Sequence, residues 1–166
     1  MFADEARFGR MNRPRPCWAP RGIRPGVASQ LIREYIHLYG AVCPQDGACV
    51  YLIMPTSNTA CFQSFLNVLS RRFARQDILL VLDGAPNCRD LAVPRNVTLL
   101  FLPPYAPELN PKENLWHEIR EKIFKNYALK SIDAVYIKLS EAIGYINRNP
   151  ELVKSITSFP YIVRSF

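Results

Sequence analysis

The first nine residues, "MFADEARFG", alternate between apolar and polar positions. This alternation predicts a β-strand, because successive side chains of a strand point to opposite faces. Four residues would share one face: Phe2, Asp4, Ala6 and Phe8. Asp4 would then lie among apolar neighbours, where a carboxylate is costly unless it is paired or bound to a metal ion. The alternative is a shifted register in which Asp4 faces water.

Apolar spacing predicts the remaining elements as well. Alternating or fully apolar runs predict further strands over 31–43, 48–54, 77–84 and 96–102. Helical spacing predicts helices over 59–75, 111–126 and 131–148, and a short helix is expected between the last two strands. The turn "CPQDG" indicates a hairpin. Residues 10–30, rich in Arg, Pro and Gly, predict an irregular basic loop with Trp18 as its anchor.

This order of elements predicts an α/β fold, with a five-stranded mixed sheet and helices on both of its faces. The run "DILLVLDG" is typical of a buried strand in a parallel sheet, and it ends at Asp83. Ligands of such folds bind at the carboxyl ends of parallel strands, so Asp83 is a candidate site residue. The alternative is that Asp83 caps the turn that follows it.

Composition narrows the class of protein. A chain of 166 residues with 49% hydrophobic content fits one globular domain. The formal net charge of +7 favours polyanionic partners, nucleic acid first. Five cysteines without CxxC spacing suggest reduced thiols in a cytosolic protein. The N-terminus lacks the apolar core of a signal peptide, and no apolar run is long enough to span a bilayer.

The stretch "PPYAPELNPKENLW" combines a proline-stiffened loop with a helix start. Asn110 suits the N-cap and Pro111 the first helical position, so Glu113 occupies the third. A capping box, in which Glu113 bonds back to Asn110, is the simplest interpretation. The other is that the rigid loop delivers the Glu113 carboxylate to a fixed point. His117 and Arg120 would share the helix face of Glu113 and could face a phosphate backbone.

Three carboxylates on three separate elements can bind two divalent cations, because Mg²⁺ and Mn²⁺ prefer oxygen ligands. Two such ions stabilise the attacking and the leaving oxygen of a phosphoryl displacement. Carboxylates far apart in sequence are a weak signal by themselves, because any globular chain has several.

Three motifs carry a resemblance to a known family: "FADEARFGR", "LVLDGAP" and "LPPYAPELNPKENLW". They resemble the DDE-type transposases of bacterial insertion sequences in the mariner-like superfamily, whose catalytic domain has a ribonuclease H-like fold. The resemblance covers residues 1 to about 148. It implies that Asp4, Asp83 and Glu113, rather than Glu108, are the catalytic and metal-binding carboxylates.

The resemblance also implies an activity and partners. We expect metal-dependent cleavage and strand transfer of double-stranded DNA with two Mg²⁺ or Mn²⁺ ions, by a homodimer at the bacterial nucleoid in the cytoplasm. The candidate DNA-binding residues are Arg10, Arg13, Arg15, Arg21, Arg24, Lys112, His117 and Arg120. The alternatives are a catalytically silent DNA-binding or dimerising remnant, and another ribonuclease H-like nuclease.

Two departures from the family pattern stand out. Twenty-nine residues separate Asp83 from Glu113, and "GAPNCRD" lacks the aromatic residue or His expected after the second Asp. Met1 lies only three residues before Asp4, so the N-terminal helix-turn-helix modules of the family are expected to be absent. The sequence therefore predicts a single catalytic domain over residues 1–166.

Overall fold

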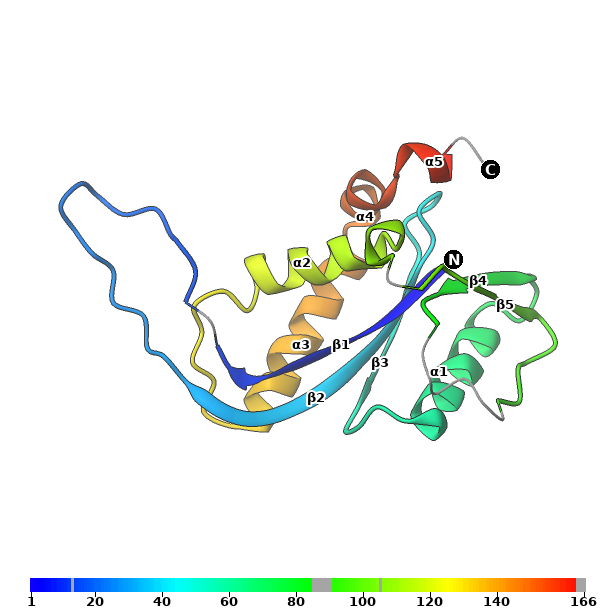
Figure 1. Ribbon diagram of the computed structural model, residues 1–166, viewed down its shortest axis with the longest axis horizontal. Helices are drawn as coiled ribbons and strands as arrows, with labels where there is room; N and C mark the ends of the chain where they lie inside the picture. The colour runs from blue at the N-terminus through cyan, green and yellow to red at the C-terminus, as the bar shows by residue number, and fades with distance from the viewer. Residues whose placement is uncertain (13, 85–90, 105, 164–166) are drawn as a thin grey trace.

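One mixed sheet organises the molecule. The computed structural model describes residues 1–12, 14–84, 91–104 and 106–163. The strands of the described residues are β1 (Phe2–Met11), β2 (Leu31–Val42), β3 (Cys49–Met54), β4 (Ile78–Leu82) and β5 (Val97–Phe101). They form a five-stranded sheet in the order β3-β2-β1-β4-β5 (Figure 1). The β1–β2 and β2–β3 pairs are antiparallel, whereas β1–β4 and β4–β5 are parallel. The predicted mixed sheet is confirmed.

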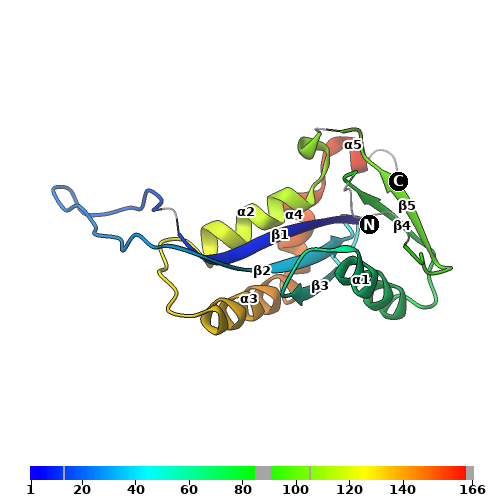
Figure 2. The same cartoon turned by 60° about the horizontal axis from the view of Figure 1, so that its bottom comes forward.

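Helices cover both faces of this sheet, as expected. They are α1 (Thr59–Arg72), α2 (Lys112–Lys122), α3 (Ile132–Asn147), α4 (Pro150–Thr157) and α5 (Pro160–Val163), with a 3₁₀ turn, η2, at Pro107–Leu109. Buried residues of α1 pack in one core, and those of the other α-helices pack in a second core (Figures 1 and 2). Strand β1 contributes Phe2, Ala6 and Phe8 to the second core and Ala3 to the first. This alternation places Asp4 on the α2 side and confirms the predicted register.

Side chains cap the N-termini of α1 and α3. Asn58 accepts a hydrogen bond from the Cys61 N–H at 2.8 Å, and Ser131 accepts one from the Ala134 N–H at 3.1 Å. Such caps satisfy N–H groups that have no partner within the helix. Helix α2 ends at Lys122, earlier than its apolar spacing predicted, and the chain then turns through Asn126, whose φ is +60°. Asn tolerates this left-handed conformation better than most residues.

The predicted hairpin between β2 and β3 is also confirmed. Its turn is closed by the Cys43 N–H, which donates to the Ala48 carbonyl at 2.8 Å. Gly47 has a φ of +75°, and a side chain there would collide with the backbone of Pro150 at the start of α4. Glycine is therefore required both by the turn and by its close packing on α4.

The basic segment 10–30 begins as part of β1 and then forms an arm that projects from the end of the sheet (Figures 1 and 2). The arm is fastened at its base, where Asn12 Oδ1 accepts from the Gln30 N–H at 2.7 Å and the Asn12 N–H donates to the Gln30 carbonyl at 3.1 Å. Trp18 is fully exposed, at 103%. The expectation that Trp18 anchors the loop is therefore wrong.

Two further differences concern the ends of predicted elements. Sequence periodicity did not predict α4 and α5, which are only eight and four residues long. The short helix expected after Asp83 falls mostly on residues 85–90, outside the described residues. Within the described residues, no helix is both long enough and apolar enough to cross a membrane.

Candidate active site

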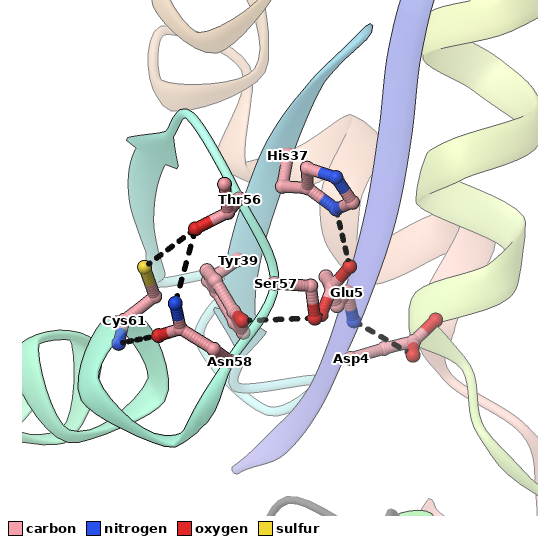
Figure 3. A network of polar contacts seen from close by, with 8 residues as sticks. All are labelled: Asp4, Glu5, His37, Tyr39, Thr56, Ser57, Asn58 and Cys61. Atoms are coloured by element: carbon pink, nitrogen blue, oxygen red, sulfur yellow. Dashed lines mark hydrogen bonds and ion pairs between the residues drawn. The ribbon is translucent and has the colours of Figure 1, made fainter.

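Asp4 lies near the start of β1, with its side chain half-buried towards α2. The Trp116 indole Nε1–H donates to Asp4 Oδ2 at 2.7 Å, and the Glu5 backbone N–H donates to Oδ1 at 2.7 Å. Figure 3 shows the side chains of Asp4 and Glu5 on opposite sides of the strand. Each Asp4 oxygen is thus held by one neutral donor, and each keeps further lone pairs for a ligand.

The charge environment of Asp4 links it to the other two candidate carboxylates. The pKa of Asp4 is raised to about 6: burial is the largest cause, the negative charges of Glu113 and Asp83 add to it, and the hydrogen bonds from Trp116 and Glu5 act in the opposite direction. Asp83 follows directly after β4, the parallel neighbour of β1, and Glu113 lies in the first turn of α2. Strands β1 and β4 and helix α2 therefore bring the carboxylates of Asp4, Asp83 and Glu113 towards the same region of the structure.

Asn110 fixes the loop that leads to Glu113. It is 1% exposed, its Nδ2 donates to the Ala3 carbonyl at 3.0 Å, and its Oδ1 accepts from the Lys112 N–H at 3.1 Å. The first bond ties the start of α2 to the residue before Asp4. The sequence placed Asn110 at the N-cap and Pro111 at the first helical position, whereas Pro111 is the cap residue in the structure and α2 begins at Lys112. The contact of Asn110 with β1 was not predicted.

The capping-box interpretation of Glu113 is wrong. A capping box requires the Glu side chain to bond to the cap residue's backbone N–H, but the Asn110 N–H donates to the Pro107 carbonyl at 2.9 Å. Glu113 is exposed, and so are His117 and Arg120 on the same face of α2. The Glu113 carboxylate is therefore not needed for the helix start.

Lys112 was expected to bind DNA, and its position in the structure contradicts this prediction. Its side chain is 0% exposed, so it cannot contact DNA as the sequence suggested. The ammonium group lies 3.9 Å from the Tyr51 ring centre and 4.4 Å from that of Trp116, and it has no hydrogen-bond partner among the described residues. Burial lowers its pKa to about 7. A side chain at Gly40 would collide with the Lys112 and Trp116 side chains, so glycine makes room for this pair.

Some of the remaining candidate DNA-binding residues are engaged by other protein groups, and others are exposed. Arg10 is occupied, because its guanidinium pairs with Glu34 at 2.7 Å and donates to the Leu129 carbonyl at 3.0 Å. We therefore assign Arg10 to the base of the arm rather than to DNA. Arg15 contacts Glu121 at 3.3 Å, and Arg21 and Arg24 are exposed on the arm. Arg13 lies outside the described residues.

A second polar network lies on the other side of β1, and sequence reasoning did not identify it. Glu5 accepts a hydrogen bond from the Ser57 hydroxyl and contacts His37 Nδ1 at 2.6 Å, while the Tyr39 hydroxyl donates to Ser57 Oγ at 3.1 Å (Figure 3). This network joins β1 and β2 to the segment that precedes α1. Both Glu5 oxygens are engaged within it.

The donor atoms of the three carboxylates bear on which metal ion they suit. The described residues contain no group of three or more His, Cys, Asp and Glu side chains arranged to hold a metal ion. Nevertheless, Asp4, Asp83 and Glu113 offer the oxygen donors that Mg²⁺ and Mn²⁺ prefer. The mutual repulsion recorded in the pKa of Asp4 is also what a cation would relieve. The chemistry of the donor set thus fits a hard divalent cation.

Solved structures with the same arrangement define the class of fold. The chain is similar to the Mos1 transposase paired-end complex with left transposon end, with a TM-score of 0.61 and 17% identity over 95% of this chain and 55% of that one. It is also similar to the Mos1 mariner paired end complex with Mn, with a TM-score of 0.63 and 16% identity over 95% and 53%. The chain spans about half the length of these Mos1 chains. Its fold is ribonuclease H-like.

The family follows from the sequence itself. A family model described as DDE superfamily endonuclease matches residues 1–136, and the chain belongs to this family. A relative from Sinorhizobium fredii (strain NBRC 101917 / NGR234), the uncharacterized protein y4pE/y4sA, is 33% identical over 125 residues, which cover 74% of this chain and 93% of the relative. The resemblance drawn from the three motifs is therefore confirmed for the family and the fold.

Proposed function

We propose that this chain is the catalytic domain of a transposase that cleaves DNA and transfers the cut strand, with Asp4, Asp83 and Glu113 holding two Mg²⁺ or Mn²⁺ ions. The observation that carries the proposal is the placement of the three carboxylates: Asp4 lies on β1, Asp83 follows β4, the parallel neighbour of β1, and Glu113 lies in the first turn of α2, whose start Asn110 holds against β1. Asp4 and Asp83 would share the two cations, and Glu113 would hold the second. Family membership supports an endonuclease of this type.

The residues around the carboxylates have distinct roles in this proposal. Trp116 and the Glu5 N–H hold the Asp4 carboxylate in one orientation, and Asn110 holds the start of α2 against β1. Such partners fix ligand orientation before a cation binds. When bound, divalent cations supply a polarised attacking oxygen and neutralise charge on the leaving oxygen. No covalent bond between the protein and DNA is required.

The proposed substrate is double-stranded DNA at transposon ends and target sites, bound by a homodimer at the nucleoid of a bacterial cell. The Mos1 transposase structures are paired-end complexes, one of them with the left transposon end. In this chain, the exposed side chains of Arg15, Arg21, Arg24, His117 and Arg120 would contact phosphates. Such contacts predict binding that weakens steeply as salt concentration rises.

The test is nicking of supercoiled plasmid DNA by the purified chain with Mg²⁺, with Mn²⁺ and with EDTA. We expect metal-dependent nicking that Asp83→Asn and Glu113→Gln lower by about a thousandfold, since each ligand supports several kcal/mol of transition-state stabilisation. Glu108→Gln is the matched control, because Glu108 is an exposed carboxylate in η2, and it should nick like the wild type. Nicking that survives Asp83→Asn would rule out the assignment.

A catalytically silent DNA-binding domain is the second candidate. The observation in its favour is that the described residues contain no group of three or more His, Cys, Asp or Glu side chains that could hold a metal ion. Salt-dependent DNA binding without nicking in either metal, by a chain whose folding is verified by circular dichroism, would favour this candidate.

A further inference from the structure

A basic cleft of about 380 Å³ lies beside the far half of β1, beyond the candidate carboxylates. Strand β4 pairs with β1 only at Phe2 and Ala3, so the described part of the sheet provides no neighbour on that edge for the rest of β1. Adjacent residues of β1, Arg7 and Phe8, both line the cleft although they point to opposite faces. The cleft therefore lies across the open edge of the strand.

Charge in this cleft is strongly unbalanced. Four cationic side chains line it: Arg7, Arg15, Arg120 and Lys125. Among the described residues, the one carboxylate paired with them is Glu121, which lies 3.3 Å from Arg15 and 3.9 Å from Lys125. The guanidinium groups of Arg7 and Arg120 lie over aromatic rings and have no carboxylate partner in the described parts of the chain. This excess of positive charge favours a polyanionic ligand.

Aromatic side chains in the cleft indicate which class of polyanion it would bind. Tyr35 and Tyr127 also line the cleft, and Tyr127 is 52% exposed. A side chain at Gly9 would collide with the Tyr35 ring, and the Arg7 guanidinium lies over that ring, 4.8 Å from its centre. A positive groove with an exposed aromatic ring, here Tyr127, is an arrangement by which proteins bind single-stranded nucleic acid. The volume suits one nucleotide and not a duplex.

The distance between the cleft and Glu113 determines how many nucleotides of a bound DNA strand would separate the two sites. Arg120 follows Glu113 by seven residues on the same exposed face of α2, a distance of about 10 Å along the helix axis. At the spacing of stacked DNA, about 3.4 Å per nucleotide, this distance spans at most about three nucleotides of one strand. We propose that the cleft binds an unpaired segment of DNA within about three nucleotides of the phosphodiester at the carboxylates. The stated number of nucleotides rests on the proposed function, because it is counted from the carboxylates. Binding of unpaired DNA in the cleft can be tested without cleavage.

The experiment measures binding of fluorescein-labelled DNA in EDTA, by anisotropy at several salt concentrations. The probes are a blunt duplex and the same duplex carrying a four-nucleotide single-stranded extension. We expect the extension to tighten binding, and we expect Tyr127→Ser to remove about five- to 100-fold of affinity for the extended probe alone. Arg7→Gln and Arg120→Gln should each weaken the extended probe and lower its salt dependence by nearly one phosphate contact.

Arg75→Gln is the matched control, because Arg75 is an exposed Arg in the turn after α1 and loses the same charge. The cleft assignment is overturned if Arg75→Gln weakens the extended probe as much as Arg120→Gln. It is also overturned if Arg7→Gln and Tyr127→Ser weaken both probes equally, or if they weaken neither. Thermal melting of every variant confirms that each is folded. Since no cleavage occurs in EDTA, a chain without nuclease activity can still pass this test, and an active nuclease can fail it.

Discussion

Asp4 and Glu5 are adjacent acidic residues on one strand, yet their surroundings differ completely. Glu5 faces the α1 side, where Ser57 and His37 engage both of its oxygens in a closed network. Asp4 faces the α2 side, where two neutral donors orient it and two further carboxylates raise its pKa. The comparison teaches that an acidic residue with satisfied partners supports the fold, whereas one placed near other negative charges is suited to bind a cation.

The largest expected effect is on DNA nicking, which should depend on Asp4 but not on Glu5. Asp4→Asn should lower metal-dependent nicking by about a thousandfold or more, because a cation ligand is lost. Glu5→Gln should retain nicking within about threefold, since this side chain is on the other side of β1. Plasmid-nicking rates at saturating Mn²⁺ measure both. A similar loss in the two variants would break the comparison.

The second effect concerns pH and stability without metal. The pKa of Asp4 in the fold is about 6, above its ordinary value of 3.8, so the folded protein binds this proton more tightly than the unfolded chain. The Asp4 contribution to stability is therefore lost as pH rises from about 4 to about 6. Wild type should lose about 3 kcal/mol relative to Asp4→Asn between pH 4 and pH 7 in EDTA, measured by urea unfolding. A pH-independent difference would show that Asp4 is not held in this environment.

The third effect tests how Asp4 is oriented. Trp116→Phe keeps an aromatic ring beside Lys112 but removes the indole donor to Asp4 Oδ2. We expect the affinity for Mn²⁺ to fall about 10- to 100-fold, because a partner that orients a ligand is lost. Mn²⁺ titration by electron paramagnetic resonance measures this loss independently of cleavage. Unchanged Mn²⁺ affinity would assign Trp116 to packing alone.

The smallest effect is expected on the Glu5 side. Ser57→Ala removes the hydroxyl that joins Tyr39 to Glu5, so the free energy of unfolding should fall by about 1 kcal/mol. Nicking and Mn²⁺ affinity should stay at the wild-type level. Urea denaturation and the same plasmid assay check both statements. A loss of Mn²⁺ affinity in Ser57→Ala would show that the two sides of β1 are not independent.

Much of the fold could be predicted because it rests on local periodicity. Alternation along β1 gave the correct faces, and the apolar spacing of α1 gave its buried stripe of Cys61, Phe62, Phe65, Leu66 and Leu69. Helices α4 and α5 span too few turns for such a pattern to emerge. The exposed face of α2 with Glu113, His117 and Arg120 was also predicted correctly.

Partners across the fold could not be predicted in the same way. Trp116 lies 112 positions from Asp4, and no local pattern indicates that its indole reaches that carboxylate. Lys112 was expected at the surface, because a Lys beside a DNA-facing Glu normally is. Its burial depends on Gly40, which leaves space on β2. Glycine at position 40 is the one feature of the sequence related to this burial. Its meaning is clear only once β2 and α2 are packed together.

The most direct test of the central claim is a crystal structure of the chain with DNA and Mn²⁺, in which anomalous scattering locates the manganese ions. The account predicts manganese bound by Asp4, Asp83 and Glu113, with oxygen ligands at about 2.0–2.2 Å. Manganese bound at Glu108 or within the Glu5–His37 network would contradict it. So would a separation of more than about 10 Å between Asp4 and either of the other two carboxylates, because shared ions with such short bonds cannot span it.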